Sequence, residues 1–75
     1  MGFTMRGTIV TLASDLGILR VQHPEIPGVL AAGTHDFRVA PEVLAAVVTG
    51  RQFLGRIEQR DGAWWVFDVR LLALN

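Results

Sequence analysis

The chain has no cysteine and no lysine, and its seven arginines are balanced by seven acidic residues. Without cysteine, neither disulfide bonds nor a thiolate zinc site can hold the fold together. The absence of cysteine leaves the cellular compartment open. The balanced charge argues against binding nucleic acid mainly by counterion release, which needs a basic excess or a basic stripe.

No run of apolar residues approaches the length of a membrane span. The opening M-G-F-T-M is too short and uncharged for a signal peptide, so an exported form has lost its signal or the chain is a fragment. At 75 residues we expect a single domain over residues 1–75. A domain of this size needs most of its apolar residues inside, and a hydrophobic content of 51% permits such a core.

The first predicted strand covers residues 6–13, R-G-T-I-V-T-L-A, which are rich in β-branched side chains. Its apolar residues Ile9, Val10 and Leu12 do not share one alternating phase. A bulge near Val10 reconciles them and bends the strand, so that it can serve two neighbours in a small barrel. Residues 14–17 then form a turn.

The segment 21–37 carries both histidines of the chain and reads V-Q-H-P-E-I-P-G-V-L-A-A-G-T-H-D-F. We predict strands over residues 18–23 and 34–39, whose side chains alternate between two faces. The inner rows contain Leu19, Val21 and His23 from the first strand, and His35, Phe37 and Val39 from the second.

Pro24 and Pro27 end the pairing of the earlier strand, because neither has an N–H to donate. Residues 28–33 are too short for a stable helix and are predicted to form a loop across the end of the barrel. Each histidine is the residue nearest to this loop in the inward-facing row of its strand. We therefore expect His23 and His35 to face each other at the rim.

Residues 40–50 are the one helical candidate. Pro41 suits the first turn, Glu42 suits the positive end of the helix dipole, and Gly50 suits the C-terminal cap. About two turns are too few to be stable alone. The helix is therefore expected to plug an apolar opening with a stripe of Val43, Leu44, Val47 and Val48.

Residues 52–59 and 63–72 predict a hairpin. A two-residue Asp-Gly turn would put charged Glu58 opposite Trp65 and Arg56 opposite Phe67. We therefore predict a three-residue turn over residues 60–62 with a bulge at its glycine. The predicted pairs are Ile57 with Trp65, Gly55 with Phe67, and Phe53 with Val69. In this register Trp65 points inward and Trp64 outward.

The element order is strand, strand, loop, strand, short helix, strand, strand. This order predicts an all-β fold, a small five-stranded OB-like barrel with one short helix between strands 3 and 4. Closure of the sheet removes exposed strand edges, and the helix covers one end.

The sequence resembles the CusF-like family of small periplasmic copper- and silver-binding proteins, a domain that also occurs fused to membrane-fusion proteins of metal efflux. The resemblance covers residues 6–72. It includes R-G-T-I-V, H-P-E-I-P-G, T-H-D-F-R-V and P-E-V-L-A-A-V-V-T-G-R-Q-F. The family's loop pattern, H-x-x-I-P-G-x-M-x-x-M-T-M-x-F, aligns without a gap to H-P-E-I-P-G-V-L-A-A-G-T-H-D-F.

In that family a histidine and a Met-x-Met pair bind a soft ion. The histidine corresponds to His23, whereas Gly33 and His35 stand where the family has its two methionines. We interpret Gly33 as a backbone requirement. The resemblance implies a periplasmic metal chaperone or an efflux accessory with an altered or degenerate site, and a metal-efflux component as partner. A cytoplasmic location is the alternative.

The remaining donors are imidazole nitrogens, which suit Cu(II), Zn(II) and Ni(II) as well as copper in either state. Our hypothesis is weak binding of such an ion at His23 and His35. Glu25 or Asp36 could add an oxygen, although Asp36 has the opposite strand phase. The structural alternative is that each histidine is half-buried and bonded to the backbone.

Two other binding functions stay open. An outward Trp64 beside Arg56, Arg60 and Arg70 could stack the bases of a single-stranded nucleic acid, although Glu58 and Asp68 share that surface. Trp64 and Leu54 could instead anchor a protein partner or a second copy of the chain. We expect no enzymatic activity, because no catalytic triad, cysteine nucleophile or phosphate-cradling glycine loop is recognisable.

Overall fold

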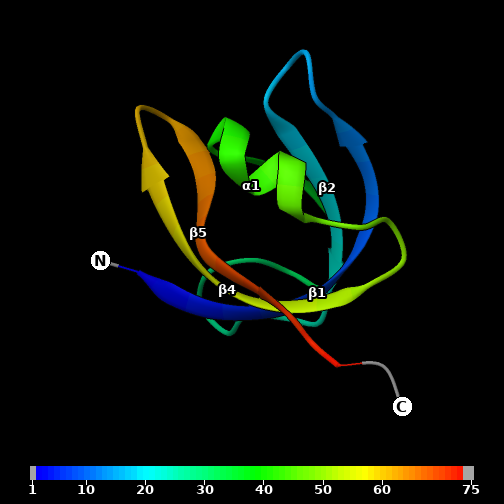
Figure 1. Cartoon of the computed structure of the whole chain (residues 1–75). Coiled ribbons are helices and arrows are strands. Elements are labelled where there is room, and N and C mark those ends of the chain that lie inside the picture. Colours follow the sequence, from blue (N-terminus) through cyan, green and yellow to red (C-terminus); the bar gives the residue numbers. More distant parts are fainter. Residues whose placement is uncertain (1, 74–75) are drawn as a thin grey trace.

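Five segments in which apolar and polar side chains alternate form a closed barrel (Figure 1). The computed structural model describes residues 2–73. The strands are β1 (Phe3–Ala13), β2 (Ile18–His23), β3 (Gly33–Arg38), β4 (Gln52–Arg60) and β5 (Ala63–Leu71), and α1 (Pro41–Ala46) lies between β3 and β4. Around the barrel the order is β1-β2-β3-β5-β4. The predicted five-stranded barrel with one short helix is confirmed.

Strand β1 pairs with two neighbours because it is long and bends near its middle. Its first half, from Phe3 to Thr8, pairs with β4, and the second half, from Thr8 to Ala13, pairs with β2. The register to β2 shifts between Ile9 and Thr11, which confirms the predicted bulge near Val10. The strand begins at Phe3, three residues before the predicted start.

The strands pair antiparallel except at one place. Strands β3 and β5 run parallel, and Arg38 opposite Trp65 is the pair that joins them. All the other neighbours are joined by longer ladders. The β3–β5 junction is therefore the shortest seam of the barrel.

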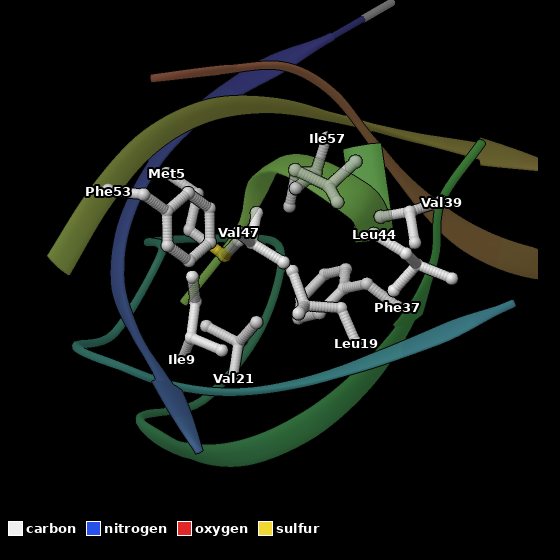
Figure 2. Close-up of a cluster of buried hydrophobic side chains, with 11 residues drawn as sticks. Met5, Ile9, Leu19, Val21, Phe37, Val39, Leu44, Val47, Phe53 and Ile57 are labelled. Atoms are coloured by element: carbon white, nitrogen blue, oxygen red, sulfur yellow. The ribbon is translucent and has the colours of Figure 1, made fainter. Parts of the chain in front are cut away.

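The core fills the inside of this barrel with side chains from every strand and from the region of α1 (Figure 2). Its buried apolar residues are Met5, Ile9, Leu19, Val21, Phe37, Val39, Leu44, Val47, Phe53, Ile57 and Val66. Burial of such side chains is the main stabilising term in a domain of this size. Phe37 and Phe53 are the largest of those with almost no exposed surface.

Helix α1 is shorter than predicted. It ends at Ala46, and Val47 is already extended, with ψ 156°. This conformation lets Val47 enter the core beside Leu44, while the N–H of Gly50 donates to the carbonyl oxygen of Ile9 at 2.7 Å. The predicted extension of this helix to a cap at Gly50 was wrong, because core packing and this bond to β1 favour an extended chain after Ala46.

The β4–β5 hairpin has a different register from the one predicted. Its turn has two residues, Asp61 with φ 51° and Gly62 with φ 77°, as a type I′ turn requires. The observed pairs near the turn are Arg56–Phe67, Ile57–Val66, Glu58–Trp65 and Gln59–Trp64. The three-residue turn and the pairs Ile57–Trp65, Gly55–Phe67 and Phe53–Val69 were wrong.

The physical reason is a second bulge. The register shifts between Leu54 and Arg56, where Gly55 of β4 faces two residues of β5, Asp68 and Val69, and the φ of Asp68 is 57°. The prediction assumed one phase along the whole hairpin and therefore put Trp65 inside. In the structure Val66 is buried, Trp64 packs against the core, and Trp65 lies on the outer face with the charged residues of β4.

The observed register predicts which residue of β5 is sensitive to a polar atom. Replacing Val66 by Thr keeps the side-chain shape but buries a hydroxyl without a partner, so the free energy of unfolding should fall by about 1–3 kcal/mol. Urea denaturation measures this change. Arg70→Thr, at an exposed position of the same strand, is the control and should stay within about 0.5 kcal/mol. Equal effects at the two positions would contradict the register.

Candidate metal centre

The pairing of β2 with β3 brings the two histidines together. In this antiparallel ladder Val21 lies opposite His35, and His23 lies opposite Gly33. His23 is 3% exposed and is the one buried side chain among residues 2–73 that is polar or titratable, whereas His35 is half-buried. The predicted inward phase of both histidines is confirmed, and their rings meet.

The contact joins one nitrogen from each ring. Nε2 of His23 lies 2.7 Å from Nδ1 of His35, and the ring centroids are 4.8 Å apart with 29° between the planes. The other nitrogen of His23, Nδ1, lies 2.8 Å from the carbonyl oxygen of Pro24. Phe37 closes the inner side of the pair, with its ring 5.9 Å from that of His23 in an edge-on arrangement.

These contacts fix the protons of the neutral pair. A carbonyl oxygen can only accept, so Nδ1 of His23 carries hydrogen and donates to Pro24. Nε2 of His23 is then an acceptor, and Nδ1 of His35 must donate to it. His35 keeps a lone pair on Nε2. The assignment follows from the hydrogen-bond network.

The hydrogen bond between His23 and Pro24 is typical of a metal-binding histidine. Metal-binding histidines usually donate their other ring N–H to a carbonyl or a carboxylate, as His23 does to Pro24. Two nitrogens that each lie about 2.0 Å from one ion are about 2.8 Å apart at a right angle and about 4 Å apart on opposite sides. A tetrahedral ion would hold them about 3.3 Å apart. The observed 2.7 Å is the length of their hydrogen bond, so a small separation of the rings would admit an ion.

Gly33 supplies no side chain to this site, and its backbone explains why. Its φ is +146°, a conformation that residues with a Cβ rarely adopt. A Cβ built there would lie 4.0 Å from Cε1 of His35, so space is not the obstacle. This geometry supports the interpretation of Gly33 as a backbone requirement.

The two carboxylates considered as further ligands lie elsewhere. Asp36 is on the outer face, where Nε of Arg20 donates to it at 2.9 Å, and this hydrogen bond lowers the pKa of Asp36 below its usual value. Glu25 is exposed in the loop after β2. Within residues 2–73, no third His, Cys, Asp or Glu gathers with the histidine pair.

The loop between β2 and β3 closes the barrel beside the site. Its tightest contact is between Ile26 and Leu30, whose backbone groups bond in both directions at 2.9 and 3.0 Å. Ile26, Val29 and Leu30 pack against the core. The predicted loop across this end is thus observed, and it holds the Pro24 carbonyl next to His23.

The chain matches no family model, no curated protein and no solved structure in these comparisons. No helix within the described part of the chain is long and apolar enough to cross a membrane.

A second group of side chains, on the outer face of the hairpin, was misplaced by the sequence reasoning. Trp65 and Phe67 are stacked there, with ring centroids 6.2 Å apart and 9° between the planes. Trp64, which was expected to be the exposed tryptophan, packs against the core instead. The Asp61-Gly62 dipeptide was the signal that could have placed them correctly, because Asp-Gly favours a two-residue turn.

The proton arrangement of the histidine pair can be tested directly. At alkaline pH, where both rings are neutral, long-range ¹H–¹⁵N spectra should show hydrogen on Nδ1 and a bare Nε2 for both His23 and His35. Protonation of His35 at Nε2 would contradict the arrangement. His35→Ala should leave the His23 tautomer unchanged, since Pro24 still fixes it.

Proposed function

We propose that this domain binds a transition-metal ion through Nε2 of His23 and Nδ1 of His35, as a metal-binding domain of CusF-like type with an altered site. When the ion binds, the hydrogen of the His35 ring moves from Nδ1 to Nε2, which frees the Nδ1 lone pair. The observation that carries the proposal is the 2.7 Å approach of these two nitrogens at the end of the barrel. The bond from His23 to Pro24 supports it, because it orients the ring and leaves Nε2 as the donor atom toward the ion.

The donor atoms favour borderline ions. Imidazole suits Cu(II), Zn(II) and Ni(II), and Cu(II) is the tightest of these for a given nitrogen site. Thioether ligands favour Cu(I) and Ag(I). Met5, the one methionine among residues 2–73, points into the core beside Phe53 and not toward a ligand site (Figure 2). With two protein ligands the affinity is weak, and water completes the coordination.

Such a domain would carry or buffer metal rather than catalyse a reaction. His35 is half-buried, so the ion has a path from solvent, whereas His23 anchors it from inside. A metal chaperone or an accessory of metal efflux in the periplasm fits this role, with a component of an efflux system as its partner. A cytoplasmic metal carrier is the alternative.

A metal titration tests the proposal. Adding Zn(II) to the apo-domain should shift the imidazole signals of His23 and His35 together in NMR spectra, and Cu(II) should broaden them. His35→Ala should weaken binding at least tenfold, which is about 1.4 kcal/mol. Gln22→Ala, an exposed neighbour of His23, is the matched control. Imidazole signals that stay unperturbed in parallel would refute metal binding at this pair.

The selectivity of the site should follow the softness of its second ligand. His35→Met replaces a nitrogen by a thioether, so Ag(I) affinity should rise and Cu(II) affinity should fall, each by at least tenfold. Competition titrations with both ions measure the ratio. Thr34→Met, on the outward-facing position next to His35, should change neither affinity. An unchanged ratio in His35→Met would show that His35 is not a ligand.

A further inference from the structure

The outer surface at the β3–β5 junction presents an aromatic face, which we define as Trp65, Phe67, Arg38 and Arg60. Trp65 and Phe67 are alternate residues of β5, so both point away from the barrel interior. Their rings are nearly parallel, at 9°, and both are half-buried. The Trp65 ring, which remains partly open to solvent, offers a flat surface for another planar group.

Two guanidinium groups lie over the Phe67 ring. The guanidinium carbon of Arg60 lies 4.5 Å from the centre of the Phe67 ring, and that of Arg56 lies 5.1 Å from it. Glu58 pairs with both arginines and is itself 19% exposed. Because Glu58 holds the arginines in place, the surface around Phe67 is ordered before any ligand arrives.

Beside Trp65 the surface is hollowed. This hollow of about 270 Å³ is lined by Arg38, Arg60, Asp61, Ala63 and Trp65, so it holds two guanidinium groups against one carboxylate. Among the residues that the structure describes, no acidic side chain pairs with Arg38. Because Arg60 is already paired with Glu58, Arg38 is the guanidinium group of this hollow that stays available to a ligand.

We propose that the aromatic face binds single-stranded nucleic acid, with a base stacked on Trp65 and a phosphate at Arg38, which is opposite Trp65 in the β3–β5 pair. Ring stacking beside a positive groove is the usual way to bind such strands without sequence preference. Trp65 offers the stacking surface and Arg38 the positive charge, so a planar anionic ligand can contact both. The zero net charge makes the interaction weak, salt-sensitive and confined to a few nucleotides.

Fluorescence anisotropy with a labelled oligothymidylate of about 12 nucleotides at low salt tests this proposal. Binding should weaken roughly 5- to 100-fold in Trp65→Ala and recover most of its strength in Trp65→Phe. Arg38→Gln should weaken binding and reduce the salt slope by about one. Arg6→Gln removes the same charge from β1 and is the matched control, which should bind like the unchanged protein.

Intrinsic fluorescence gives a second readout. The oligonucleotide should quench tryptophan emission in the unchanged protein but not in Trp65→Phe, where Trp64 is the remaining emitter. Two outcomes overturn the proposal. One is binding that is absent or is insensitive to Trp65→Ala and Arg38→Gln. The other is self-association, seen by sedimentation, that Trp65→Ala abolishes and the oligonucleotide does not displace, which would make this face a protein interface.

Discussion

The register between β2 and β3 is the constraint on which the metal-centre proposal depends. With Val21 opposite His35 and His23 opposite Gly33, both histidine rings lie inside the rim and their nitrogens meet at 2.7 Å. A slip by one residue would turn one ring to the outside, because neighbouring side chains of a strand point to opposite faces. Leu19, Val21 and Phe37 hold this register by their burial, so the apolar core fixes the position of the polar pair.

Two bulges, one in β1 and one in β5, determine which other side chains face inward or outward. The shift near Val10 lets β1 pair with both β2 and β4, which closes the barrel in a short chain. The bulge at Asp68 reverses the phase of β5, so Trp65 faces outward while Leu71 packs against the core. The two faces of the barrel thus acquire separate chemistry: imidazoles at the inner rim, and aromatic rings with guanidinium groups outside.

The sequence was sufficient where a single alternating phase runs through a segment. Strand β2, the inward rows of His23 and His35, the bulge in β1 and the overall architecture were all predicted from that pattern. It was insufficient where tertiary contacts change the phase. The end of α1 depends on the hydrogen bond between Gly50 and Ile9. The outward position of Trp65 depends on a bulge at Asp68, a residue type that does not announce a positive φ. The Pro24 carbonyl, which orients His23, had no signature in the sequence.

The seam at which β3 and β5 meet has a further consequence for motion. A single parallel pair, Arg38 with Trp65, closes the barrel there, whereas the other junctions are extended antiparallel ladders. Local opening follows the weakest set of hydrogen bonds, so backbone amides along this junction should exchange with solvent before those of β1 and β2. Strand β3 carries His35 as well as Arg38, and breathing of this seam would therefore loosen the inner rim and the outer hollow at the same moment.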